Sequence, residues 1–170
     1  MLKKFAMLFG LILAFSLAAH AQDSDKIQVF GGYSYLRLDS TPTTNTNGFL
    51  FSGEYKINHW LGAVGEFGGE YGSGLHLYTY LFGPQISANY GRFSPFAHVL
   101  LGGAHANLSG SGSSNNSFSM AVGAGLDAKL VHGVYWRVFE GDYVPTFYSP
   151  LSFSGTQSNA RFSTGIVIKF

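Results

Sequence analysis

Apolar and polar residues alternate with a period of two along five segments of this chain, and no other feature constrains the fold as strongly. In Ser117–Leu130, for example, Met120, Val122 and Ala124 alternate with small or polar residues such as Ser119 and Gly123. Such alternation places successive side chains on opposite faces of a β-strand. Glycine, which supplies 23 of the 170 residues, recurs inside these segments and disfavours helix there. The chain is therefore predicted to be all-β.

Three further segments carry the alternation less cleanly, which brings the number of predicted strands to eight. The first segment favours Val29, Tyr33 and Tyr35 outward, although Phe30 and Leu36 weaken the contrast. The fifth has apolar residues on both faces, and the seventh has Arg137 on one parity and Asp142 on the other, so the facing of these three segments stays open. The second, fourth and sixth connections are tight turns, whereas three of the other four are long and rich in Ser, Thr, Asn and Gly. The predicted strands are Ile27–Leu38, Gly48–Asn58, Trp60–Tyr71, Leu75–Asn89, Phe93–Asn107, Ser117–Leu130, Val134–Val144 and Asn159–Phe170.

The polar faces of these strands decide between a soluble sheet and a membrane barrel. They carry mostly Ser, Gly and Thr, and charged residues make up 11% of the chain, whereas a solvated surface is about a quarter or more charged. The strands are longer than the usual 5–6 residues of globular sheets and match the roughly 9–11 that cross a bilayer at a tilt. In lipid a sheet must close, because a free edge leaves backbone groups unpaired. We predict an eight-stranded antiparallel up-and-down transmembrane β-barrel. A soluble lipocalin-like barrel would instead need an apolar lumen and a polar exterior, the reverse of what this alternation indicates.

The first 21 residues are predicted to be a cleaved signal peptide. Lys3 and Lys4 precede an apolar stretch that closes on Ala19-His20-Ala21, a small-x-small cleavage site with Ala19 and Ala21 at its key positions. The stretch is shorter than the ~20 apolar residues of a membrane anchor. We expect residues 22–170 to form one barrel domain, and the absence of cysteine excludes lipoprotein processing, disulfides and thiolate metal sites.

The first and last strands resemble those of a known family. Val29-Phe30-Gly31-Gly32-Tyr33-Ser34-Tyr35 and the final segment Arg161–Phe170 are similar to the small outer-membrane β-barrel proteins related to the OmpA transmembrane domain. The resemblance implies a Gram-negative outer membrane, both termini in the periplasm and long loops outside. The terminal residues Phe162, Ile166, Ile168 and Phe170 look like the signal that the barrel assembly machinery recognises. The sequence shows no peptidoglycan-binding domain after Phe170, so cell-wall anchoring is not expected.

Most charged residues of the strands are predicted to face the lumen. A β-bulge near Glu140 and Gly141 would bring Arg137 and Asp142 to the same face. An eight-stranded barrel leaves room inside for little more than side chains, so we predict a lumen plugged by ion pairs. We expect Arg137 to be a central cation paired with Glu54, Glu66 or Glu70. The predicted lumenal set is Glu54, Lys56, Glu66, Glu70, Asp127, Lys129, Arg137, Asp142 and Arg161.

No catalytic, cofactor or metal site is expected. His98 and His105 have opposite parity on one strand and so cannot converge on a metal, and Gly102-Gly103 lacks the strand-turn-helix setting of a phosphate loop. A lipid-modifying barrel enzyme would need a lipid-facing His and Ser, and no His-x-Ser-Asn run occurs.

The sequence leaves two main functional classes. The first is a structural or surface barrel that contributes to envelope integrity or recognition through its loops; the alternative is a narrow small-solute porin. Pro145–Ser158, with Phe147, Tyr148, Leu151 and Phe153, is the best candidate contact loop, its partner unknown. The expected partners are outer-membrane lipid, lipopolysaccharide and the barrel assembly machinery, with no nucleic acid, because the formal charge of +1 provides no basic patch. A monomer is expected.

Overall fold

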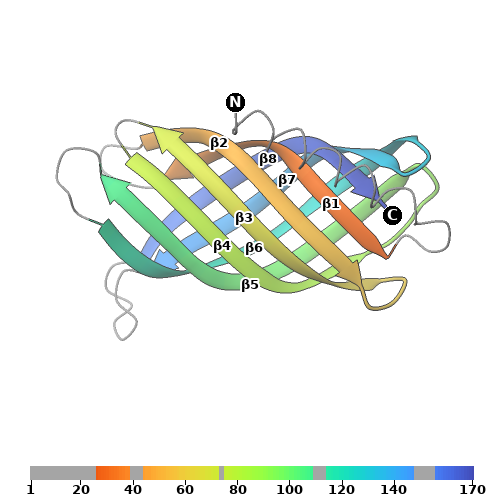
Figure 1. The fold of residues 1–170 in the computed structure, drawn as a ribbon, viewed down its shortest axis with the longest axis horizontal. Coiled ribbons are helices and arrows are strands. Elements are labelled where there is room, and N and C mark those ends of the chain that lie inside the picture. The colour runs from red at the N-terminus through yellow and green to blue at the C-terminus, as the bar shows by residue number, and fades with distance from the viewer. Residues whose placement is uncertain (1–25, 39–43, 73–74, 109–113, 148–155) are drawn as a thin grey trace, which may run out of the picture.

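Eight antiparallel strands pair in the order of the sequence, and the eighth pairs with the first, so the sheet closes into a barrel (Figure 1). The computed structural model describes residues 26–38, 44–72, 75–108, 114–147 and 156–170. Within those ranges, no helix has the length and hydropathy needed to cross a membrane. The predicted signal peptide with Ala19 and Ala21, and the loop residues Tyr148, Leu151 and Phe153, lie outside the described residues. The strands are β1 (Ile27–Leu38), β2 (Thr44–Lys56), β3 (Leu61–Gly72), β4 (Leu75–Ser87), β5 (Phe93–Leu108), β6 (Ser114–Val131), β7 (Val134–Phe147) and β8 (Thr156–Lys169).

Short turns join the strands at one end of the barrel, which we call the turn end, and the opposite end is the loop end. Both ends of the described chain, Lys26 and Phe170, lie at the turn end, where Ile27 and Phe170 exchange backbone hydrogen bonds of 3.2 and 2.8 Å. Gly91 and Gly133 adopt φ values of 63° and 75° in two of these turns, a region that favours glycine. In the turn between β2 and β3, the Asn58 side chain accepts backbone hydrogen bonds that tighten the chain reversal.

The register of the strands fixes the tilt of the barrel. A line of paired residues that starts at Leu61 on β3 and follows the sheet once around the barrel returns to β3 at Tyr71, ten positions further along the strand. Such a stagger makes the strands cross the barrel axis obliquely, as Figure 1 shows. Residues at one height in the lumen therefore come from different levels of neighbouring strands.

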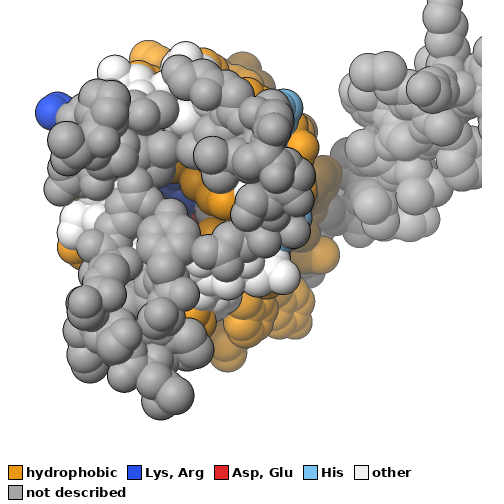
Figure 2. Space-filling model, turned by 90° about the vertical axis from the view of Figure 1, so that its left-hand side faces the viewer, with side chains coloured by type: hydrophobic (Ala, Val, Ile, Leu, Met, Phe, Trp, Pro, Cys, Tyr) orange, Lys and Arg blue, Asp and Glu red, His pale blue; other side chains and the backbone are white. Residues whose placement is uncertain are grey.

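The outer face of the barrel is apolar along most of its height. Side chains at alternate positions, such as Phe82 (65% exposed) and Phe162 (56%), point away from the lumen. Figure 2 looks onto the loop end and shows hydrophobic side chains along the outer wall, with part of a Lys or Arg side chain visible in the centre. The facing of β1, which the sequence left open, is settled by Val29 and Tyr33 outside and Phe30 and Leu36 inside.

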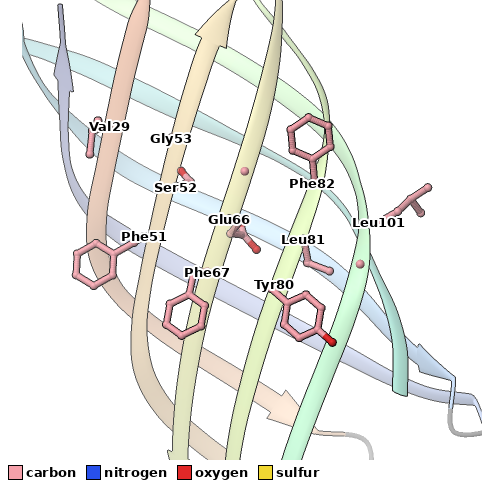
Figure 3. Close-up of a pocket in the computed structure, with 12 residues that line it drawn as sticks. Val29, Phe51, Ser52, Gly53, Glu66, Phe67, Tyr80, Leu81, Phe82 and Leu101 are labelled. Atoms are coloured by element: carbon pink, nitrogen blue, oxygen red, sulfur yellow. The ribbon is translucent and has the colours of Figure 1, made fainter. Parts of the chain in front are cut away.

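A shallow groove of about 630 Å³ marks this outer face across β2 to β5. Gly53 and Gly65, paired across β2 and β3, leave space between the rings of Phe51, Phe67 and Phe82 (Figure 3). A side chain added at Gly53 would meet no atom within 4 Å. The groove therefore lies on the outward-facing side of the sheet, and its lining also includes the buried residues Glu66 and Leu81.

The lumen is filled by both apolar and charged side chains. Three apolar clusters lie inside it, the largest formed by Val64, Leu81, Leu100, Ala121 and Val144. A second cluster holds Phe30, Leu50, Tyr135 and Val167, and a third holds Leu36, Leu77 and Ala104. The alternation along the strands predicts small polar residues and ions on this face, and the structure adds these apolar clusters between the charged groups.

A β-bulge interrupts β7. Leu126 pairs with Phe139 and Asp127 pairs with Arg137, so Val138 has no partner on β6. The unpaired residue lies two positions before Glu140, so the bulge comes slightly earlier than the position near Glu140 and Gly141 predicted from the sequence. It reverses the facing of the strand, so that Arg137 before it and both Glu140 and Asp142 after it point into the lumen.

Candidate functional site

Arg137 anchors the half of the lumenal charge network nearer the turn end. Its Nε donates to Asp127 Oδ1 at 2.9 Å and its Nη2 to Oδ2 at 3.3 Å, which makes the pair bidentate. Its Nη1 donates to Glu140 Oε2 at 3.2 Å. The guanidinium carbon also lies 4.3 Å from the ring centroid of Phe30 and 4.2 Å from that of Phe96. Cation–π contact with both rings and two carboxylates thus hold Arg137 from several sides.

Arg161 on β8 anchors the other half. Its Nε and Nη2 donate to Asp142 Oδ2 at 2.9 and 2.6 Å, and Nη2 lies 2.7 Å from Glu66 Oε1. Asp142 faces Arg161 across the β7–β8 pair, and Glu66 comes from β3 on another part of the wall. Arg161 therefore ties together strands that are not neighbours in the sheet.

His98 on β5 links the two halves. Its Nε2 lies 2.9 Å from Asp142 Oδ1, and its Nδ1 lies 3.8 Å from Glu140 Oε1. Ser163 donates to Glu140 Oε2 at 2.7 Å. The resulting chain of contacts runs without a break from Asp127 through Arg137, Glu140, His98, Asp142 and Arg161 to Glu66.

The network is almost fully removed from solvent. Arg137 is 4% exposed, Arg161 2% and Glu140 1%. Charges in such surroundings are stable only when they are paired and hydrogen-bonded. Four carboxylates surround two guanidiniums and one imidazole here, and each carboxylate contacts at least one of these nitrogen groups.

His98, Glu140 and Asp142 are also residue types that bind metals, and their ligand atoms lie within 4.8 Å of one another. Asp142 already accepts two hydrogen bonds from Arg161, and Glu140 accepts one each from Arg137 and Ser163. These donors bind Asp142 Oδ2 and Glu140 Oε2, and the other oxygen of each carboxylate faces His98 at 2.9 and 3.8 Å, so every carboxylate oxygen already faces a polar group of the network. We therefore assign the three residues to the ion-pair network.

Four of the expected lumenal residues lie on the inner face away from this network. Glu54 Oε2 accepts a hydrogen bond from Gln85 at 2.8 Å, and Glu70 Oε1 accepts one from Ser34 at 2.5 Å. Lys56 donates to Ser87 at 2.9 Å near the turn end. Lys129 is half-buried at the same end, on β6.

The pairing expected for Arg137 is wrong. It contacts Asp127 and Glu140, whereas of the three expected partners Glu66 pairs with Arg161 and the other two bind neutral side chains. The reason is local: Asp127 lies directly opposite Arg137 on β6, and the bulge turns Glu140 inward three residues later. Glu140 was missed because its facing depends on where the bulge falls.

His98 was also missed as a member of the network. Both faces of its strand carry apolar residues, so hydropathy did not show which face points to lipid and which to the lumen. Between Phe93 and Leu101, the polar residues Ser94 and His98 share one parity with Phe96 and Leu100, whereas the other parity of this stretch, which includes Val99, carries no polar residue. That difference would have identified the lumenal face. His105, of opposite parity, contacts Asn116 Oδ1 through Nδ1 at 2.5 Å in an exposed position.

A family model described as "Outer membrane protein beta-barrel domain" matches residues 7–169 of the chain. The chain belongs to this outer-membrane β-barrel family. It lies in the outer membrane of Gram-negative bacteria, as family members do. No curated protein matches the chain in sequence.

Solved structures of other small barrels superpose on this one. Neisserial surface protein A (NspA) matches with a TM-score of 0.67 and 15% identity, covering 86% of this chain and 98% of its own. The N-terminal β-barrel domain of Pseudomonas aeruginosa OprF matches with a TM-score of 0.59 and 12% identity, over 85% and 98% of the two chains. Ail, the attachment invasion locus protein of Yersinia pestis, matches with a TM-score of 0.56 and 18% identity, over 85% and 97%. At such identities the likeness establishes the fold.

Membership of the outer-membrane β-barrel family orients the molecule. Short turns of bacterial barrels face the periplasm and longer loops face outward, so the turn end is periplasmic. Exposed aromatic residues, among them Trp60, Tyr90 and Trp136, lie at this end. Such rings favour the membrane–water interface and mark the periplasmic boundary of the apolar band.

Proposed function

We propose that this outer-membrane barrel serves a structural or surface role, with a lumen closed by the Arg137–Arg161 network, and that solutes do not pass through it. The observation that supports this most directly is the burial of the network together with the apolar clusters beside it. Leu50, Leu100 and Val167 have no solvent exposure, so the lumen at their positions has no space for water beside them. A water-filled channel would leave such side chains in contact with solvent.

A non-enzymatic role is part of the proposal. His98 contacts Asp142 inside the barrel, and His105 contacts Asn116 in an exposed position. Neither contact joins a histidine to a serine, which a hydrolytic nucleophile would require. The contribution to envelope integrity or recognition would come from the outer face and the loops.

The proposal also covers how the barrel is inserted and what surrounds it. Phe162, Ile166 and Ile168 point outward on β8, as a strand read by the barrel assembly machinery would present them. We propose that this machinery inserts the chain, and that the inserted barrel is a monomer surrounded by lipid and lipopolysaccharide.

Conductance in planar bilayers tests the closed lumen. Wild-type barrel should give no stable channel, whereas Arg137→Ala should raise conductance by opening a path past Asp127 and Glu140. Arg37→Ala is the matched control, because Arg37 is exposed on β1 rather than lumenal. A stable wild-type channel whose conductance is the same in Arg137→Ala would favour a narrow small-solute porin and contradict the proposal.

A further inference from the structure

A cavity of about 320 Å³ opens at the periplasmic turn end, separate from the ion-pair network. It is lined by Lys26, Lys56, Lys169 and His59, with the amide side chains of Asn58 and Asn89. Its lining includes Ile57 but no Asp or Glu among the residues that the structure describes. We call this cavity the basic pocket.

The closed sheet brings together Lys56 of β2, Lys169 of β8 and Lys26, which directly precedes β1. The backbone N–H of Lys56 donates to the carbonyl of Lys26 at 2.7 Å, which fixes the start of β1 beside the end of β2. Lys169 on β8 pairs with Gln28 on the other side of β1. Because Lys56 and Lys169 share the inward parity of their strands, their side chains reach the mouth of the lumen.

Neutral groups hold two of the ammonium groups in place. Lys56 Nζ donates to Ser87 Oγ at 2.9 Å, and Lys169 Nζ lies 4.0 Å from the ring centroid of Tyr135. The buried carboxylate of Glu54 interacts electrostatically with both lysines from within the lumen. The described lining thus holds three lysines and no Asp or Glu, which favours an anion in the pocket.

We propose that the basic pocket binds the phosphate group of an anionic ligand. A phosphate offers several acceptor oxygens and negative charge, which match converging ammonium and amide donors. A cavity of 320 Å³ equals the liquid volume of about ten water molecules, which suits a phosphate with a small substituent. Basic pockets of this kind recognise anionic lipid head groups at membrane surfaces.

The phosphate can come from a phospholipid head group of the periplasmic leaflet or from a soluble phosphate ester. Ile57, which lines the pocket, is 63% exposed, and Trp60 beside the same turn is 48% exposed. Apolar and aromatic side chains at this level place the pocket at the height of lipid head groups. The site does not depend on whether the lumen conducts.

Two variants and one matched control test the proposal. Lys26→Gln removes an exposed lysine outside the strands, so folding should be preserved, and Lys26→Gln/Lys56→Gln removes two lining charges. Lys129→Gln removes a lysine of the same rim that does not line the pocket. Folding of each variant is checked by heat-modifiable gel mobility.

The first measurement titrates inorganic pyrophosphate into the barrel in a neutral detergent, by calorimetry. The second compares the urea midpoint of unfolding in phosphatidylcholine vesicles with and without phosphatidylglycerol, since a ligand of the native state stabilises it. We expect the affinity for pyrophosphate to fall about tenfold in Lys26→Gln and further in the double variant. The shift of the urea midpoint caused by phosphatidylglycerol should shrink in the same order. Lys129→Gln should stay near wild type.

The two measurements distinguish the sources of the phosphate. A response to phosphatidylglycerol without one to pyrophosphate identifies a lipid head group, and the reverse identifies a soluble ester; both outcomes support the pocket. No response to either probe overturns the proposal. An equal loss in Lys129→Gln also overturns it, because the effect would then reflect net charge alone.

Discussion

Replacing Arg161 by methionine should destabilise the barrel severely, because it removes a buried cation and leaves two carboxylates behind. The Arg161 guanidinium lies 2.6 Å from Asp142 and 2.7 Å from Glu66, and it is 2% exposed. Methionine is unbranched and apolar and can occupy much of the same space. The cost therefore comes from charge and hydrogen bonding more than from a cavity.

The magnitude follows from the burial of all three groups. Removing one partner of a buried ion pair costs about 3–5 kcal/mol, because the remaining charge is uncompensated. His98 still contacts Asp142, so the cost falls mainly on Glu66, whose contact with a cation is lost. We expect Arg161→Met to lower the free energy of unfolding by about 3–5 kcal/mol, a factor of at least about one hundred in the unfolding equilibrium.

The assay is reversible urea unfolding from lipid vesicles, followed by tryptophan fluorescence. A compensated variant, Arg161→Met with Glu66→Gln and Asp142→Asn, removes the charges together while keeping the shapes of both side chains. Neutral replacement of a whole buried ion-pair group is often neutral or stabilising. The compensated variant should therefore recover most of the lost stability.

Two results would refute this reasoning. If Arg161→Met alone stays within about 1 kcal/mol of wild type, the network does not contribute as a set of buried pairs. If the compensated variant is as unstable as the single one, the loss comes from packing around position 161 and not from the uncompensated carboxylates.

Three further predictions follow from the backbone. Gly48→Ala should reduce the folded fraction in vesicles, because the added Cβ would lie 1.8 Å from the carbonyl oxygen of Gly69. Gly53→Ala is the control and should fold as wild type, because its added Cβ would meet no atom within 4 Å. Equal folded fractions of the two variants would contradict this prediction. Deleting Val138 removes the extra residue and leaves Arg137, Phe139 and Glu140 in one continuous alternation, so Arg137 and Glu140 should both stay in the lumen and heat-modifiable mobility should be kept. Loss of the folded band would show that the strand needs the bulge itself. Deleting Phe170, which closes the barrel through two backbone hydrogen bonds with Ile27, should lower outer-membrane assembly in cells, measured by protease protection, and unchanged assembly would argue against a role for the terminal residue.

The inward or outward facing of most charged residues could be read from the sequence. Glu66, Arg161 and Asp127 lie in strands where apolar and polar residues alternate cleanly, and all three are buried in the lumen. The partners of these residues could not be read in the same way. Glu66 meets Arg161 from another part of the wall, because the stagger of the closed sheet brings different levels of distant strands to one height.

The inward facing of Glu140 and His98 could not be predicted from strand parity and hydropathy alone. Strand parity assigns a face only while the register is continuous, and the unpaired Val138 breaks it just before Glu140. His98 lies in a strand with apolar residues on both faces, so that hydropathy alone does not separate lipid from lumen. Both residues turned out to join the two arginine clusters.

An eight-stranded barrel with an apolar outer face follows from the amino-acid pattern alone, because a chain in lipid with period-two alternation, scarce charge and long strands can satisfy its backbone only by closing the sheet. The family match and the closed sheet agree with that prediction. The tertiary structure decided which charges meet, since closure, stagger and one bulge set the distances across the lumen. Closure of the sheet also places Lys26, Lys56 and Lys169 around one pocket, although Lys56 and Lys169 lie 113 positions apart in the sequence.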